Sequence, residues 1–382
     1  MQNPNEATER AQATRNAHFI GLDALRFLMA FCVVLFHYEI LISPHLAPEH
    51  RLFGAFDAAV DFFFMLSGFV ICHVYGHAQW NMANYASYLW RRLARIYPLH
   101  LLTLVACLAV IALAAKSGMK VNNLGRYDLA DLPAQLLMVH AWGVSDHLSF
   151  NTVSWSISAE FFVYLLFPLL ATVVRAAGWV RAAVVVIVLM ATLSFVTSTV
   201  IEPHWLRRSY DFGALRALPT FTAGIVLWHL CHQTNRPTRA VANWFAAIAA
   251  IVLAMGLMLL QQSREALLIA FAAAIVAVAR AEATAPLSGR IANLLQTLGN
   301  ASYGLYMLHL MIGMAIFKIA VPRIGLLRDM PLLAAALALA ISLVAAIASY
   351  RVFEAPVRRL LTRRRSQPTI PPVQHATYMP QQ

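Results

Sequence analysis

The chain has 382 residues, of which 60% are apolar and 12% are charged, and its mean hydropathy is +0.65. Soluble globular proteins contain about 45–50% apolar and about 25% charged residues, so this composition excludes a soluble protein, a disordered chain and a disulfide scaffold. The net charge is +12, from 29 Lys and Arg against 17 Asp and Glu. In a membrane protein that excess is typical of basic cytoplasmic loops, and no polar domain is large enough for a nucleic-acid-binding fold.

The hydropathy pattern predicts an all-α, polytopic transmembrane bundle of about ten spans, because a span needs ~20 apolar residues. We expect the spans near residues 20–42, 57–76, 98–116, 154–175, 180–201, 213–231, 242–261, 265–280, 296–320 and 331–353. The segment 133–143 is too short to span and is expected as a short helix at the membrane surface.

The spans form one expected transmembrane domain, residues 18–356, between two polar tails. Residues 1–17 are polar, and the apolar run after them is too long for a signal peptide, so the first span is expected to be a retained anchor. Residues 357–382 are basic and then rich in Pro and Gln, which is typical of disorder. Lys and Arg are more numerous on the side of the two tails, so the positive-inside rule predicts that both termini are cytoplasmic.

The first span carries Asp23, Arg26 and His37, which a bilayer rejects unless they face the bundle interior. His37 follows Arg26 by about three helical turns, so the two share a face, and Asp23 can pair with Arg26 across one turn. A neutral imidazole at this depth is a candidate general base; the alternative is a core histidine satisfied by one hydrogen bond. Arg26 and Lys318 are the basic residues that we expect inside spans.

A basic run, Arg91, Arg92 and Arg95, precedes Pro98, which fits the first turn of the third span. Arg92 and Arg95 face the same way if the run is helical. At the inner membrane surface, guanidinium groups bind phosphates in a bidentate manner. The alternative is that the run only anchors the span by the positive-inside rule.

The fourth span opens with Ser154, Trp155 and Ser156 and carries Glu160 and Tyr164 further in. A carboxylate about two turns inside a span must be paired or protonated. Glu160 is therefore expected to orient a histidine, to bind a sugar hydroxyl or to cap a buried arginine. Trp155 is either an interfacial belt residue or a platform for a sugar ring.

The ninth span carries Tyr303, Tyr306 and His309. A histidine among apolar and aromatic residues is expected either to be structural or to line a cavity.

Five motifs in this order resemble the membrane-bound acyltransferase 3 family, which includes bacterial polysaccharide and Nod-factor O-acetyltransferases. The motifs are GLDALR at 21–26 followed by His37, DFFFMLSGF at 61–69, RLAR at 92–95, SWS at 154–156 with Glu160 and Tyr164, and SYGLYMLH at 302–309. The resemblance covers about residues 20–355. The chain departs from relatives at Phe161, where a second acid is frequent, and at Leu310 and Met311, where a Trp-Pro pair is common.

The resemblance implies transfer of an acyl group, usually acetyl, from cytoplasmic acyl-CoA to a hydroxyl of a cell-surface or lipid-linked carbohydrate. It also implies a multi-pass protein of the bacterial inner membrane. The implied site residues are His37, Arg26, Glu160 and Asp23 for catalysis, Arg92, Arg95 and Arg91 for acyl-CoA, and Trp155, Ser154, Tyr164, Tyr306 and His309 for the acceptor. Whether His37 acts as a general base or carries the acyl group is left open.

No bound cofactor and no metal are expected, and acyl-CoA is a donor substrate; the four cysteines lie in or beside apolar segments without a CxxC pair. A proton-coupled exporter of a glycan or lipid is the main alternative, with Arg26, His37 and Glu160 as its relay, although the chain has no inverted repeat. A structural or sensor protein would tolerate replacement of His37. The protein acts either as a single chain or as a homodimer.

Overall fold

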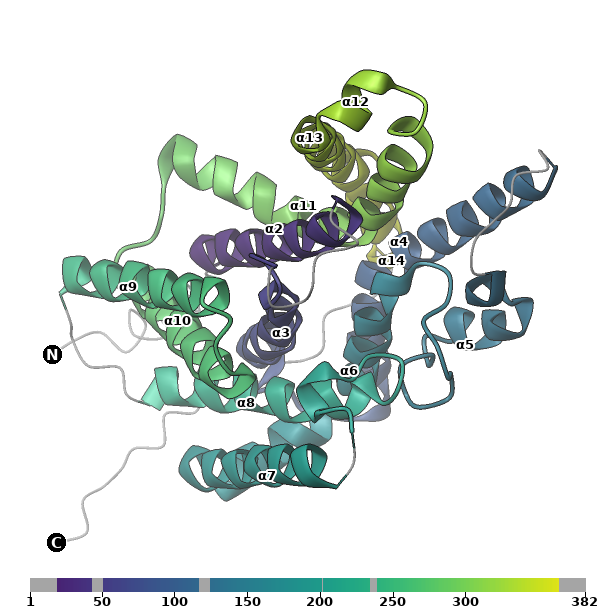
Figure 1. Ribbon diagram of the computed structural model, residues 1–382. Coiled ribbons are helices and arrows are strands. Elements are labelled where there is room, and N and C mark those ends of the chain that lie inside the picture. The colour runs from purple at the N-terminus through teal and green to yellow at the C-terminus, as the bar shows by residue number, and fades with distance from the viewer. Residues whose placement is uncertain (1–18, 43–50, 117–123, 201, 234–238, 364–382) are drawn as a thin grey trace, which may run out of the picture.

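The computed structural model of the protein describes residues 19–42, 51–116, 124–200, 202–233 and 239–363. Within these ranges the chain is helical and contains no strand (Figure 1). Ten helices are long and apolar enough to cross a membrane, which confirms the predicted bundle of about ten spans. Helices suit a bilayer because their backbone N–H and C=O groups are bonded within the helix. The predicted tail 1–17 lies outside the described residues, and the orientation of the termini stays a prediction.

The long helices follow one another along the chain, and the longest connection, between α4 and α6, covers residues 117–154. They are α2 (Ile20–Ile42), α3 (Ala59–Tyr75) with η2 (Phe56–Ala58) before it, α4 (Met82–Lys116), α6 (Trp155–Ala177), α7 (Trp179–Thr199), α8 (Gly213–Gln233), α9 (Ala240–Leu259), α10 (Arg264–Thr284), α11 (Gly289–Ala315) and α13 (Pro331–Ser349). The shorter elements are η3 (Leu124–Tyr127), η4 (Leu129–Asp131), α5 (Leu132–Leu136), η5 (Thr152–Ser154), η6 (Trp205–Arg207), η7 (Ile316–Ala320), α12 (Gly325–Asp329), η8 (Tyr350–Glu354) and α14 (Ala355–Thr362). Helix α14 extends into the segment 357–382 that was predicted to be a tail, and residues 364–382 lie outside the described part.

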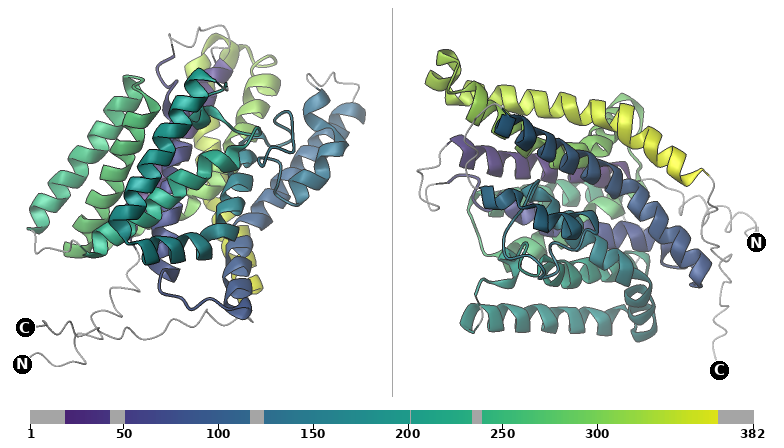
Figure 2. Two further views of the ribbon diagram at one scale, coloured as in Figure 1. Left: turned by 90° about the horizontal axis from the view of Figure 1, so that it is seen from below. Right: turned by 90° about the vertical axis from the view of Figure 1, so that its right-hand side faces the viewer.

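Helix α3 is the most buried of the ten spans and lies near the middle of the bundle (Figure 1). Helices α7 and α9 are the least buried. On α7 the side chains of Val184, Val185 and Ile187 are all more than half exposed. In the right-hand view of Figure 2 the long helices run side by side, with α13 along one edge and α7 along the opposite edge. The exposed valine and isoleucine side chains therefore form a lipid-facing surface.

Helices α3 and α8 meet backbone to backbone through two glycines. A Cβ atom at Gly68 would lie 2.0 Å from the carbonyl oxygen of Phe221, and one at Gly224 would lie 1.9 Å from that of Met65. No real Cβ atom tolerates such distances, so only glycine fits at either position. Small residues allow membrane helices to approach closely, because there is little hydrophobic driving force between helices in lipid.

Helix α4 corrects the prediction that Pro98 begins the third span. The helix begins at Met82 and continues through Pro98 to Lys116. Proline removes one helical hydrogen bond, but a membrane helix accommodates it because neighbouring groups satisfy the freed carbonyl. As a consequence, Arg91, Arg92 and Arg95 lie inside the helix and not in a loop before it.

The helix predicted over 133–143 is shorter than expected, because α5 ends at Leu136. Met138 has a φ of 55°, a left-handed conformation that a helix does not contain. The chain then turns into the bundle, where Ala141 is buried and its N–H donates to the Ser158 hydroxyl at 3.0 Å. This segment packs against α6 and does not continue as a surface helix.

Candidate active site

Five helices, α2, α3, α4, α6 and α11, surround one cavity inside the bundle. The polar residues that line it are Arg26, Ser67, Arg92, Arg95, Ser156, Glu160, Tyr164, Ser302, Tyr303 and Tyr306. Apolar side chains such as Phe63, Val70 and Ile96 complete the wall. The cavity thus brings together members of all five sequence motifs, from helices far apart in the chain.

Three arginines line the cavity, and each is held differently. The guanidinium of Arg26 donates to the Asp23 carboxylate at 2.8 Å, which confirms the predicted pair. Arg92 donates to the Tyr75 hydroxyl at 3.4 Å and lies over the Tyr75 ring, 5.3 Å from its centroid. Arg95 makes no hydrogen bond or ion pair with any described residue. The half-buried guanidinium of Arg95 is therefore available to an anionic ligand.

A second, smaller cavity shares two of its walls with the first. Its lining consists of Arg95, Asn300, Tyr303, Tyr350, Glu354 and Arg358. Arg95 and Tyr303 line both cavities, so they mark the place where the two adjoin. Arg91, predicted to act with Arg92 and Arg95, is not among the lining residues of either cavity.

Glu160 lies in the first cavity and is hydrogen-bonded on one oxygen. Its Oε1 accepts from the Tyr164 hydroxyl at 2.5 Å and from the Ser67 hydroxyl at 2.8 Å. These bonds join α6 to α3 and satisfy part of the carboxylate, as burial requires. Of the predicted roles, orientation of a histidine has no support in these contacts, because Glu160 does not touch His37.

Tyr306 of α11 is held in the cavity wall by two hydrogen bonds to the start of α6. Its hydroxyl shares a hydrogen bond of 2.8 Å with the Ser156 hydroxyl and donates to the Val153 carbonyl at 3.1 Å. The Phe63 ring stands edge-to-face against the Tyr306 ring, with 5.8 Å between the centroids. The Tyr306 ring is therefore fixed at the boundary of the cavity.

His37 is not part of the cavity lining and pairs instead with His309. Nδ1 of His37 lies 3.1 Å from Nε2 of His309, a contact between α2 and α11. His309 is fully buried, whereas His37 is half-buried. One turn along α11 separates His309 from Tyr306, so the histidine pair lies close to the cavity boundary. Both histidines were candidate site residues in the sequence, but the sequence did not predict that they are in contact.

Ser154 and Trp155, predicted to bind the acceptor, do not line this cavity. The buried Ser154 hydroxyl lies 3.2 Å from Nε2 of His140, and Trp155 stacks on the guanidinium of Arg216, 5.2 Å from its ring centroid. Burial, together with the neighbouring His100, lowers the pKa of His140 to about 3. These contacts belong to the packing between the 124–154 segment, α6 and α8.

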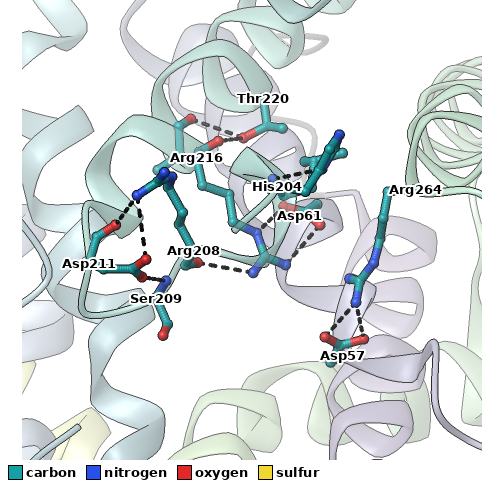
Figure 3. Close-up of polar contacts among 11 residues, drawn as sticks. Asp57, Asp61, His204, Arg208, Ser209, Asp211, Arg216, Thr220 and Arg264 are labelled. Atoms are coloured by element: carbon teal, nitrogen blue, oxygen red, sulfur yellow. Dashed lines mark hydrogen bonds and ion pairs between the residues drawn. The ribbon is translucent and has the colours of Figure 1, made fainter. Parts of the chain in front are cut away.

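An ion pair between Asp61 and Arg216 was missed by the sequence analysis and corrects the expectation that Arg26 and Lys318 were the basic residues inside spans. Nε and a terminal nitrogen of Arg216 donate to the two Asp61 oxygens at 2.7 and 2.9 Å (Figure 3). Both side chains are buried, and the remaining nitrogen donates to the Arg208 carbonyl at 3.3 Å. Two opposite charges within apolar runs were the available signal, because each needs a partner in the membrane.

A second carboxylate–arginine contact lies nearby. Arg264, at the start of α10, donates to both oxygens of Asp57 at 2.7 and 2.6 Å (Figure 3). The two pairs connect α8 and α10 to η2 and α3. Neither pair lines a cavity described above.

Comparison with known proteins shows that the chain is similar to acyltransferases. A family model described as "Acyltransferase domain" matches residues 19–351. The chain is similar to "Acyltransferase MdmB" of Streptomyces mycarofaciens, with 31% identity over 338 residues, 82% of this chain and 84% of the relative. It is also similar to "Protein 2 in picA locus" of Rhizobium radiobacter, with 35% identity over 102 residues, 25% of this chain and 50% of that protein. No solved structure matches the chain.

Proposed function

The chain belongs to this family of membrane acyltransferases, and on that premise we propose that it moves an acyl group from acyl-CoA to a hydroxyl of a carbohydrate. Acetyl is the first candidate for the acyl group, and a cell-surface or lipid-linked sugar is the candidate acceptor. Both follow from the motifs that the chain shares with polysaccharide O-acetyltransferases. The proposed location is the bacterial inner membrane, with the arginine-lined cavities open to the cytoplasm.

The observation that carries the proposal is the placement of Arg95. Its guanidinium lines both cavities and makes no hydrogen bond or ion pair with a described residue, although its charge interacts with the Glu354 carboxylate in the smaller cavity. A half-buried cation without a hydrogen-bonded partner is costly, and a bound phosphate lowers that cost with bidentate hydrogen bonds. Acyl-CoA supplies phosphates and a slender thioester arm on one molecule.

The two cavities suggest how the donor is arranged. Arg95 and Arg358 face the smaller cavity, and Arg26, Arg92 and Arg95 face the larger one. The phosphates of acyl-CoA would lie at Arg358 and Arg95, and the thioester arm would extend past Arg95 toward Glu160. Tyr164 and Tyr306 offer hydroxyl groups along that path.

The proposed chemistry is nucleophilic acyl transfer with His37 as general base. His37 takes the proton of the acceptor hydroxyl while the hydroxyl oxygen attacks the thioester carbonyl carbon. The C–S bond breaks, and His37 returns the proton to the departing thiolate, so the products are an ester and free CoA. A positioned base supplies about 10²–10⁴ in rate. The step requires His37 to meet the thioester, which draws the donor arm beyond the Tyr306 boundary.

The test is a kinetic comparison on the purified protein, with acceptor supplied and both acyl-CoA consumption and acylated glycan measured by mass spectrometry. Arg95→Ala is expected to raise the apparent KM for acyl-CoA about tenfold or more, because a charge-assisted contact contributes about 1.5–3 kcal/mol. His37→Ala is expected to lower kcat by about 10² or more. Arg359→Ala, which removes an exposed arginine of α14 outside both cavities, serves as the matched control.

The proposal fails if the folded His37→Ala protein acylates the acceptor at the wild-type rate. An exporter would move glycan across vesicles without consuming acyl-CoA, so the same assay separates that alternative. If Arg95→Ala behaves like Arg359→Ala, Arg95 is only an anchoring residue.

A further inference from the structure

The geometry points to His309 as the positioning residue that fixes the tautomer of His37 and leaves Nε2 of His37 free of a proton. The inference deepens the proposed function and rests on the proposed role of His37 as general base. The family motifs identify neither the contact between the two rings nor the direction of the hydrogen bond. Both follow from the atoms around each ring.

The first step is the tautomer of His309. Its Nδ1 lies 2.8 Å from the Tyr306 carbonyl and 3.1 Å from the Leu305 carbonyl. A carbonyl oxygen only accepts, so Nδ1 must carry the proton. His309 is fully buried and has no carboxylate partner among the described residues, so the ring is neutral. Its Nε2 therefore carries a lone pair and can only accept.

The second step is the tautomer of His37, which follows from that of His309. Its Nδ1 faces two acceptors, Nε2 of His309 at 3.1 Å and the Val33 carbonyl at 2.9 Å. An unprotonated Nδ1 would leave three acceptors facing one another without a proton. Nδ1 of His37 is therefore protonated, and in the neutral imidazole Nε2 holds the lone pair. That nitrogen makes no hydrogen bond with any described residue.

Tyr38, the residue after His37, holds α2 and α11, the two helices that bear the rings, in place relative to each other. The Tyr38 hydroxyl lies 2.7 Å from the Ser342 hydroxyl and reaches the carbonyl of His309 at 3.1 Å. These bonds tie α2, α11 and α13 together next to the histidine pair. The distance between the two rings is thus set by the backbone positions of α2 and α11, as a positioning contact requires.

The consequence for the reaction is that Nε2 of His37 is the nitrogen that can accept a proton. Only a proton-free Nε2 can take the proton of the acceptor hydroxyl, and the alternative tautomer would present an N–H there. When His37 becomes protonated, Nε2 of His309 continues to accept from Nδ1 and stabilises the imidazolium. In this role His309 acts through its contact with His37, which differs from the acceptor-binding role that the resemblance implies for it.

The experiment compares three variants of the purified full chain by steady-state acyl transfer. In His309→Gln the amide oxygen can still accept from Nδ1 of His37, whereas His309→Leu has no acceptor. Met307→Leu, a volume-conserving change at a fully buried position on the same helix, is the packing control. Thermal unfolding in detergent checks that each variant is folded, and His309→Phe, which also lacks a lone-pair acceptor, replaces the leucine variant if that protein does not fold.

We expect His309→Leu to lower kcat by about 10²–10⁴ and to leave the apparent KM for acyl-CoA within about twofold. His309→Gln should keep kcat within about tenfold of the wild type, and Met307→Leu should match the wild type. Equal losses in the Gln and Leu variants, or a fully active Leu variant, would overturn the inference. If His37→Ala is inactive while His309→Leu is fully active, this inference alone fails; if His37→Ala is active, the proposed base is wrong.

Discussion

The buried side chain of His140 shows how the folded protein disfavours the charged form of a histidine. Its ring is 4% exposed, stacks on His100 with 5.9 Å between centroids and meets the Ser154 hydroxyl. The pKa of His140 is lowered to about 3 by burial, with a smaller contribution from His100. In the unfolded chain the ring takes up a proton near pH 6.5, so the unfolded state binds more protons between these two values.

The free energy of unfolding is therefore expected to fall as the pH drops below about 6.5. Between pH 7 and pH 5 the contribution of His140 amounts to about 2 kcal/mol. His140→Gln retains a polar group toward Ser154 and cannot titrate, so it should lose less stability over the same interval. Thermal unfolding of both proteins in detergent at the two pH values measures the difference. Equal acid sensitivity in wild type and variant would contradict the prediction.

Contacts within one helix could be predicted from the sequence, whereas contacts between helices could not. Asp23 and Arg26 are three residues apart, and helical geometry alone brings them together. His37 and His309 belong to helices whose register depends on the packing of α2 against α11, including the Tyr38 contacts. The same limit explains why the Asp61–Arg216 pair was missed, although each charge was visible in an apolar run.

The contact of α3 with α8 depends on glycine at position 68. Alanine at that position would place its Cβ 2.0 Å from the Phe221 carbonyl oxygen. The backbone of α8 would have to move to make room for that atom. Overpacking of this kind costs about 1–3 kcal/mol, and more where backbone must move. Gly68→Ala should therefore lower the unfolding temperature clearly.

The matched control is Gly256→Ala, because a Cβ at that position of α9 meets no atom within 4 Å. There the substitution should be neutral or stabilising by up to about 1 kcal/mol, since alanine favours a helix more than glycine does. Thermal unfolding of the two variants side by side decides the matter. Comparable stability of both proteins would show that the α3–α8 contact is loose.

The number of spans could be predicted because apolar length is a strong signal in lipid. The start of the third span could not be predicted, since the residues before Pro98 include arginines, and a hydropathy pattern excludes charged residues from a span. Arg92 and Arg95 are tolerated because α4 turns them toward the interior cavities. The fold of the 124–154 segment could not be predicted either, since its buried polar groups bond one another within the segment and also reach His100 and the Met307 carbonyl.

Ten crossings, an even number, are expected to place the start of α2 and the end of α14 on the same side of the membrane. The indole of Trp90 donates to the Leu361 carbonyl at 2.8 Å, which holds α14 beside the first half of α4. The segment that contains Asp146 follows α4, the third span, and is therefore expected on the side of the membrane opposite to α14. If the positive-inside prediction holds, α14 is cytoplasmic and Asp146 is not.

Cysteine labelling in intact cells tests that orientation. Asp146→Cys and Arg359→Cys replace exposed residues, while Cys32, Cys72 and Cys107 are buried and Cys231 is half-buried, so background labelling is low. A membrane-impermeant thiol reagent should label the cysteine at position 146 in intact cells and the one at position 359 after permeabilisation. The reverse pattern would invert the topology and place the arginine-lined cavities away from cytoplasmic acyl-CoA.

The backbone contact between α3 and α8 also determines which parts of the protein can move. No layer of side chains lies between the two helices at Gly68 and Gly224, and the Asp61–Arg216 pair joins them at a further point. Rotamer changes cannot loosen such a joint, so the two helices behave as one stiff wall. Helix α4 is joined to α6 by single tyrosine hydrogen bonds of 3.1 and 3.3 Å. If the cavity widens to admit a donor, we therefore expect α4, which carries Arg92 and Arg95, to move against the stiff α3–α8 wall.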